Sequence, residues 1–369
     1  MTTEVASELG GGRITRIDGI RAVAVVLVFA FHTGFVNYGW LGVHLFFVLS
    51  GFLITGILRR MRDEPHFWAP FYIKRVARIL PPLLLVFGAA AYFYHAYPTR
   101  RPAVALDMLF LSNVAQVLYP KSDYNLGLLW SLAVEEHFYL LWPIAIRFLS
   151  RTSILRILAV VIVLEPIARG IMTPFTHDHN IVFYLTPFQL DGLAAGSLLA
   201  LLVENSANTA WLRRYSGWAT FISGLLIATL YPLVPSFNRD VNSILFNSIG
   251  YSLIILFGFA LLAFTLFHPK TLLVRILDHP WIVFVGTISY GIYLFHPLWL
   301  SFFIVKGHKH GIHHDKLTAP FALLTTILMA WLSFHFYEKP IIAWGRKLAR
   351  RYEHGNHTEP TSPLVTTAK

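Results

Sequence analysis

Long runs of apolar residues recur along the chain, and each is about as long as a membrane-spanning helix. An α-helix rises about 1.5 Å per residue, so about twenty apolar residues cross the hydrocarbon core of a bilayer. The runs are continuous and do not alternate, which argues against a transmembrane barrel. We therefore predict an all-α, polytopic bundle of about ten transmembrane spans. The expected spans lie near residues 20–36, 39–58, 79–97, 127–149, 154–171, 181–203, 217–234, 244–267, 281–305 and 318–337.

Composition supports a membrane protein and removes several other classes. Hydrophobic residues make up 56% of the 369 residues and charged residues 13%, and the mean hydropathy is +0.58. A soluble core does not need so much apolar surface. Cysteine is absent, which excludes a disulfide framework and thiolate chemistry.

The net charge of +11 is explained by membrane topology. With the N-terminus inside, most Lys and Arg residues fall on the cytoplasmic side of the predicted spans, as the positive-inside rule requires. We therefore expect a multi-pass protein of a bacterial-type inner (plasma) membrane with both termini in the cytoplasm, and no nucleic-acid partner. The basic clusters on that side are Arg59–Arg60–Arg62, Lys74–Arg75–Arg78, Arg147–Arg151–Arg156, Arg213–Arg214 and Arg346–Lys347–Arg350–Arg351.

One membrane domain is expected. Residues 1–12 are predicted to be a disordered cytoplasmic N-terminus, 13–345 the membrane domain, and 346–369 a basic and then disordered cytoplasmic tail. The outside loop around 103–118 is predicted to carry a short amphipathic helix.

The first span contains two ionisable residues on one face. Arg21 and His32 are eleven residues apart, which on a helix is about 16 Å of rise and within about 20° of the same direction. Asp18 falls on the same stripe. Buried ionisable groups in membranes usually serve function, so we predict an anionic ligand whose reactive end reaches into the membrane, with the imidazole of His32 as a general base. The alternative is an ordinary interhelical hydrogen bond.

The fourth span carries a second group of polar residues. Glu135 and Glu136 point in different directions on a helix, whereas Ser131, Glu135 and Tyr139 share one face at i, i+4 spacing. Intramembrane carboxylates are costly, which favours a functional role. The alternative places both carboxylates at the outer, solvated interface.

Three further groups could bind ligand. Arg75 and Arg78 are suited to clamp a phosphate near a helix N-terminus, although lipid anchoring also explains them. Ser50 offers a hydroxyl inside the second span, within a run of small residues that could simply pack helices. Tyr293 and His296 share a polar stripe with Ser289 that either lines a cavity or packs. The loop histidines near 177–179 and 308–314 are interpreted as solvated, and no metal site is assigned.

Several short motifs occur in a fixed order along residues 16–340. They are Arg21-x10-His32, Gly42–Val43…Phe46–Phe47–Val48–Leu49–Ser50–Gly51–Phe52, Arg75-x-x-Arg78–Ile79–Leu80–Pro81, Trp130–Ser131–Leu132–Ala133–Val134–Glu135–Glu136, Ile288–Ser289–Tyr290-x-x-Tyr293–Leu294-x-His296–Pro297 and Glu338-x-Pro340. In order and spacing the chain resembles the acyltransferase-3 family of integral membrane O-acyltransferases, which includes polysaccharide acetylases.

The resemblance implies a function. The family has about ten spans and moves an acyl group, commonly acetyl, from cytoplasmic acyl-CoA to a hydroxyl of a cell-envelope glycan, a lipid-linked sugar or a secreted metabolite. It implies catalysis by His32 with Glu135. Donor binding would fall to Arg21, Arg75, Arg78 and Ser50. Substrate binding is expected from Trp130, Ser131, Tyr139, Tyr293 and His296.

Two features depart from the family pattern. Members often carry aspartate where this chain has His44, glutamine where it has His137, and arginine near Gln189; these differences concern the acceptor more than the reaction. Many relatives also carry a C-terminal hydrolase-like domain with a serine nucleophile. This sequence ends before such a domain, so the chain is expected to deliver the acyl group itself or through a partner. The rival hypotheses are a transporter or flippase of lipid-linked sugars and a sensor whose polar residues only pack.

Overall fold

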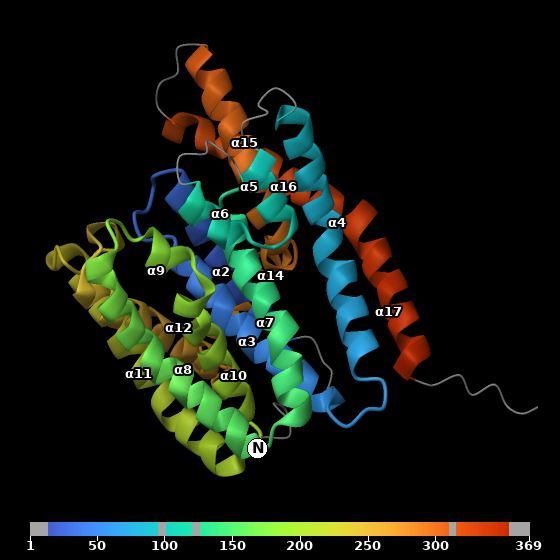
Figure 1. Ribbon diagram of the computed structural model, residues 1–369, viewed down its shortest axis with the longest axis vertical. Coiled ribbons are helices and arrows are strands. Elements are labelled where there is room, and N and C mark those ends of the chain that lie inside the picture. Colours follow the sequence, from blue (N-terminus) through green and yellow to red (C-terminus); the bar gives the residue numbers. More distant parts are fainter. Residues whose placement is uncertain (1–13, 95–100, 120–125, 310–314, 354–369) are drawn as a thin grey trace, which may run out of the picture.

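The computed structural model describes residues 14–94, 101–119, 126–309 and 315–353. Every regular element in these ranges is helical (Figure 1), as the apolar runs predict. The α-helices are α2 (Thr15–His32), α3 (Leu41–Met61), α4 (Trp68–Tyr94), α5 (Arg101–Met108), α6 (Ser112–Leu118), α7 (Leu129–Phe148), α8 (Arg151–Met172), α9 (Asn180–Tyr184), α10 (Leu190–Leu202), α11 (Ser206–Leu233), α12 (Tyr251–Phe267), α13 (Leu272–Leu277), α14 (Pro280–Thr287), α15 (Ser289–Lys309), α16 (Asp315–Leu332) and α17 (Lys339–Glu353). Short 3₁₀ and π turns join them: η2 (Thr173–Phe175), η3 (Thr186–Phe188), η4 (Arg239–Val241), η5 (Phe246–Gly250) and η6 (Ser333–Glu338).

The described helices are consistent with a membrane protein, but they do not fix the number of times the chain crosses the membrane. Four helical stretches are long and apolar enough to cross a membrane, and five if the bent pair α14–α15 counts as one. Each of the ten predicted spans coincides with one or more helices. Several of these helices are too short or too polar to meet the criterion alone, so the count of about ten stays a prediction.

Two predicted spans are broken. The span expected at 181–203 consists of α9, η3 and α10, and the one at 281–305 bends by 69° between α14 and α15. At the second break Gly286 lies directly on α2, where a Cβ atom would come within 1.8 Å of the carbonyl oxygen of Asp18. The bend therefore lets two backbones touch, and only glycine leaves room for this contact.

Helices α3 and α10 pack backbone against backbone within the bundle. A Cβ atom on Gly51 would lie 2.0 Å from the carbonyl oxygen of Leu193, and one on Gly196 would lie 2.0 Å from that of Val48. Small residues allow such backbone approach in membrane helices. The run around Ser50 therefore does pack helices, as one of the two interpretations of that run holds.

The chain ends and loops differ from expectation in detail. Helix α2 stops at His32, four residues before the predicted end, and the chain then turns through Gly34 with a φ of 69°. The amphipathic helix predicted at 103–118 is two helices, α5 and α6, separated by Phe110 at a φ of 56°. The predicted disordered N-terminus at 1–12 lies outside the described residues, as do residues 354–369 of the predicted tail, whereas residues 346–353 of that tail belong to helix α17.

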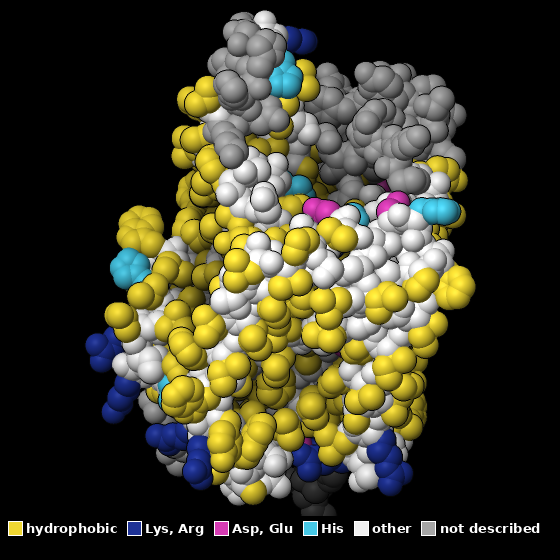
Figure 2. Space-filling view, turned by 90° about the vertical axis from the view of Figure 1, so that its left-hand side faces the viewer, with side chains coloured by type: hydrophobic (Ala, Val, Ile, Leu, Met, Phe, Trp, Pro, Cys, Tyr) yellow, Lys and Arg dark blue, Asp and Glu magenta, His cyan; other side chains and the backbone are white. Residues whose placement is uncertain are grey.

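Helices α4 and α17 lie side by side at one edge of the bundle (Figure 1). Their contact is close at Gly345, where a Cβ atom would meet that of Ala77 at 2.5 Å, and Lys74 pairs with Glu353 at 2.5 Å. Figure 2 shows hydrophobic side chains across the middle of another face, with Lys and Arg gathered at its lower end. A membrane-embedded bundle with one basic end has this distribution.

Candidate active site

An elongated cavity of about 620 Å³ lies among α2, α3, α4, α7, α10 and α15. Helix α3 lines it from Val43 to Arg60, a distance of about 25 Å along the helix axis. The volume is within the range of small-molecule sites. Its polar and charged lining residues are Asp18, Arg21, Ser50, Arg59, Arg60, Arg75, Arg78, Ser131, Glu135, Tyr139, Glu204, Ser289, Tyr290 and Tyr293.

Three arginines from two helices meet in this cavity. Arg21 of α2 pairs with Asp18 at 3.3 Å. The guanidinium group of Arg75 lies 5.8 Å from the ring centre of Tyr139, and Arg78 lines the same space one turn later on α4. The predicted contribution of a helix N-terminus is wrong, because α4 begins at Trp68 and its first turns precede both arginines.

Ser50, Glu135 and Tyr139 form one hydrogen-bonded group in the middle of the cavity wall. The hydroxyl of Ser50 donates to Glu135 Oε1 at 2.7 Å, and that of Tyr139 donates to Oε2 at 2.8 Å. The group joins α3 to α7. The adjacent Glu136 does not line the cavity, which agrees with the predicted divergence of the two carboxylates.

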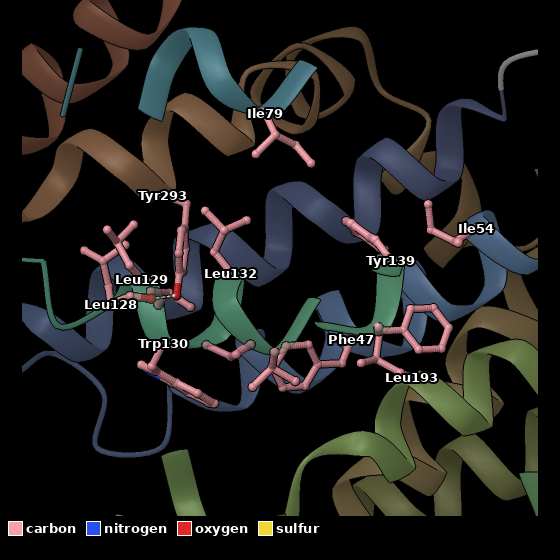
Figure 3. Packing of buried hydrophobic residues seen from close by; sticks show 14 of the residues in the cluster. Phe47, Ile54, Ile79, Leu128, Leu129, Trp130, Leu132, Tyr139, Leu193 and Tyr293 are labelled. Atoms are coloured by element: carbon pink, nitrogen blue, oxygen red, sulfur yellow. Dashed lines mark hydrogen bonds between the residues drawn. The ribbon is translucent and has the colours of Figure 1, made fainter. Parts of the chain in front are cut away.

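A second hydrogen-bonded group lines the cavity where α15 meets the start of α7. The hydroxyl of Tyr293 donates to the carbonyl oxygen of Leu128 at 3.0 Å and lies 2.7 Å from Ser131 Oγ. Figure 3 shows Tyr293 reaching from α15 to the start of α7. Ser289, one turn earlier on α15, also lines the cavity, whereas the fully buried His296 does not. Of the predicted polar stripe on α15, Ser289 and Tyr293 therefore line the cavity, whereas His296 packs between helices.

His32 and His296, neither of which lines the cavity, pack against each other beside Tyr293. Their ring centres are 5.0 Å apart, and His32 Nδ1 lies 3.4 Å from His296 Nε2. His32 Nδ1 also lies 2.9 Å from the carbonyl oxygen of Val28, and His296 Nδ1 lies 2.8 Å from that of Tyr293. Because a carbonyl oxygen only accepts, each neutral ring carries its proton on Nδ1. Nε2 of His32 therefore keeps its lone pair.

Arg21 and His32 are placed differently relative to the cavity. Arg21 lines the cavity and His32 does not, although both lie on one side of α2 as predicted. The physical reason is α15, which packs against α2 and places Tyr293 and His296 between the cavity and His32. The ring centre of Tyr293, which lines the cavity, is 6.0 Å from that of His296, and the ring centre of His296 is 5.0 Å from that of His32.

A cation lies beside His32 at this end of the bundle. The side chain of Arg239, from η4, is 12% exposed, and the ring of Phe31, which it covers, is 5.2 Å from the ring of His32. In the loop before α9, burial lowers the pKa of His179, and the charge of Arg239 lowers it further. The rings under the guanidinium group of Arg239 are those of Phe31, Trp40 and Phe183 at 5.2, 5.5 and 4.9 Å.

Trp130 and the three positions that depart from the family pattern, His44, His137 and Gln189, lie outside the cavity lining. Trp130 packs on Phe183 with 4.7 Å between ring centres. His44 is buried in the same aromatic cluster, and His137 Nδ1 lies 2.7 Å from the hydroxyl of Thr186. These side chains pack against or hydrogen-bond to neighbouring segments and do not face the cavity.

Sequence reasoning missed a buried ion cluster around Arg169. Its guanidinium group donates to Asp191 at 2.6 Å and Glu165 at 3.3 Å, and to the carbonyl oxygens of Asn247 and Phe188 at 2.7 and 3.0 Å. The cluster ties α8, α10 and η5 together. The i, i+4 spacing of Glu165 and Arg169 inside one predicted span was the available signal.

Comparison with known proteins finds relatives over most of the chain. A family profile described as an acyltransferase domain matches residues 14–338. The peptidoglycan O-acetyltransferase OatA of Listeria monocytogenes is 30% identical over 89% of this chain and 56% of its own length. O-acetyltransferase OatA of Staphylococcus aureus is 27% identical over 90% of this chain and 57% of its own length.

The chain spans just over half the length of these relatives, 56% and 57%. No solved structure matches it. The family profile covers nearly the whole of the described membrane bundle, including the cavity and both histidines. The chain therefore belongs to the acyltransferase-3 family.

Proposed function

We propose that the protein is a membrane O-acyltransferase that moves an acyl group, with acetyl expected, from cytoplasmic acyl-CoA to a hydroxyl of a cell-envelope glycan. Lipid-linked sugars and secreted metabolites are the alternative acceptors. The observation that carries the proposal is the single cavity in which three arginines and the Ser50–Glu135–Tyr139 group face one space. Family membership and the relatives named as O-acetyltransferases support the reaction type.

The donor would enter this cavity from the basic end of the bundle. Arg21, Arg75 and Arg78 would bind its phosphate groups, since guanidinium groups form paired hydrogen bonds with phosphate oxygens. The acyl end would then point toward Ser131 and Tyr293. In this arrangement the basic end faces the cytoplasm, both termini lie there, and about ten spans hold the cavity in the membrane.

His32 would act as the general base toward the acceptor. Its Nε2 lone pair would take the proton of the acceptor hydroxyl, and the oxygen would attack the thioester carbonyl. The carbon–sulfur bond then breaks, an ester forms, and the CoA thiolate leaves and is protonated. His296 lies between the cavity end and His32, so a displacement of Tyr293 or His296 would bring the acyl group within reach of the base.

The test is acceptor-dependent CoA release by the purified protein, with acetyl-CoA and peptidoglycan fragments or candidate metabolites. His32→Ala should abolish acceptor-dependent release and leave CoA binding intact, whereas Arg21→Gln should raise the KM for acetyl-CoA. The exposed His335→Ala is the matched control. Full transfer by His32→Ala would overturn the assigned base. Movement of lipid-linked sugars without CoA consumption would favour the transporter.

A further inference from the structure

A second group of basic residues lines the mouth of the cavity, which is its end beside the last turn of α3. Arg59 and Arg60, in the last turn of α3, line it together with Glu204, just after α10. Arg59 Nε and Nη2 donate to the two oxygens of Glu204 at 3.0 and 3.3 Å. Arg151, at the start of α8, approaches the same carboxylate at 3.6 Å. Two guanidinium groups thus face one carboxylate, and with Arg60 beside them in the cavity lining the mouth keeps a positive excess.

This group is separate from the deeper arginines. Along α3, Arg59 and Arg60 lie nine and ten residues from Ser50, a rise of about 14 to 15 Å. Ser50 is in the same hydrogen-bonded group as Tyr139, whose ring lies under Arg75. One cavity therefore presents two positively charged regions, one at the mouth and one in the middle. A ligand with two anionic groups separated along its length would match both.

The ion pair at the mouth can be exchanged for another anion. The side chains of Arg59 and Glu204 are 21% and 34% exposed, and partly exposed ion pairs contribute little stability. A phosphate monoester carries close to two negative charges and three acceptor oxygens, so it competes well with a carboxylate for a guanidinium group. Glu204 would then hold Arg59 at the mouth until the ligand arrives.

We propose that Arg59 and Arg60 bind the terminal phosphate monoester of the donor's nucleotide, while Arg21, Arg75 and Arg78 bind its diphosphate. The inference rests on the proposed function and extends it to a site that recognises the carrier. It makes the mouth a determinant of donor specificity. A carrier that lacks the terminal phosphate should still bind to the arginines in the middle of the cavity. It should lose its contacts with Arg59 and Arg60 at the mouth.

The experiment compares acetyl-CoA with 3′-dephospho-acetyl-CoA, using full-length protein in nanodiscs of neutral lipid. The parent protein should show a KM about tenfold higher for the dephospho donor, the ratio expected for one charge-assisted contact. Arg59→Gln and Arg60→Gln should each bring the ratio to within about threefold. Arg156→Gln, an exposed basic residue outside the cavity lining, should keep the parent ratio. Arg59→Lys should retain part of it.

Binding of CoA and of 3′-dephospho-CoA, measured calorimetrically on the same samples, separates this inference from the proposed function. A parent that binds both equally, or mouth variants that keep the parent ratio, would overturn the inference even if turnover is normal. A parent that prefers CoA but never transfers an acyl group would count against the function and leave the mouth site intact. Nanodiscs containing phosphatidate test the other source of a phosphate monoester. If Arg59→Gln changes only the response to this lipid, the mouth binds lipid and the inference is wrong.

Discussion

Removing the hydroxyl group of Ser50 or Tyr139 tests most directly whether Glu135 takes part in the reaction. Both donate to its carboxylate, at 2.7 and 2.8 Å. Ser50→Ala and Tyr139→Phe each remove one donor and leave the carboxylate and its charge in place. If the position of this carboxylate matters for transfer, both variants should be impaired although neither loses an ionisable acid.

The size of the effect follows from the chemistry of these bonds. A hydrogen bond to a charged group contributes about 1.5 to 3 kcal/mol, which corresponds to about 10- to 150-fold in kcat/KM. The double variant should lose less than the product of the two single effects, because both hydroxyls act through one carboxylate. The melting temperature should change little, because the group faces a cavity in which water can replace the lost donor.

The assay is acceptor-dependent CoA release over a range of acetyl-CoA concentrations. Ser223→Ala on α11 removes a hydroxyl that bonds only within its own helix and lies outside the cavity lining, so it controls for serine loss in general. Single variants with parent kcat/KM would refute the role of this group. A multiplicative double variant would show that the two hydroxyls act independently of the shared carboxylate.

Three further outcomes are expected. Arg169→Met should destabilise the protein by about 3 to 5 kcal/mol, since it leaves buried carboxylates unpaired, and thermal unfolding followed by fluorescence measures this; an unchanged midpoint would contradict it. Gly196→Ala should lower the midpoint because its Cβ atom would meet a carbonyl oxygen at 2.0 Å, whereas Gly88→Ala, which meets nothing within 4 Å, should not. Because the pKa of His179 is lowered in the folded state, the unfolded chain binds its proton first; stability should fall as the pH drops below about 6.5, and His179→Asn should flatten that loss in pH-dependent melting curves.

The helical elements were predictable because apolar runs of membrane length leave the backbone few alternatives to a helix. The breaks were less predictable. The bend before Ser289 depends on Gly286 lying on the carbonyl group of Asp18, a contact between residues far apart in the chain. Nothing in the local sequence distinguishes this glycine from one that only weakens a helix.

The site was predictable where its residues share one helix. Ser131, Glu135 and Tyr139 line one cavity because i, i+4 spacing places them on one face. Two other contacts depend on how α3, α7 and α15 dock. They are the hydrogen bond from Ser50 to Glu135 and the contact of His32 with His296. Such docking is set by tertiary packing, which periodicity within a single helix does not report.

Helix α2 joins the two halves of the proposed reaction through one uninterrupted rod of backbone. Because a helix does not stretch, the axial spacing between Arg21 and His32 stays constant whatever molecule occupies the cavity. Inserting one residue between them would turn the imidazole through about 100°, whereas inserting seven would nearly restore its direction and add about 10 Å. The length of the acyl carrier must therefore fit both the axial distance between Arg21 and His32 and the direction in which His32 points from the helix. A carrier of another length would require another spacing of these two residues.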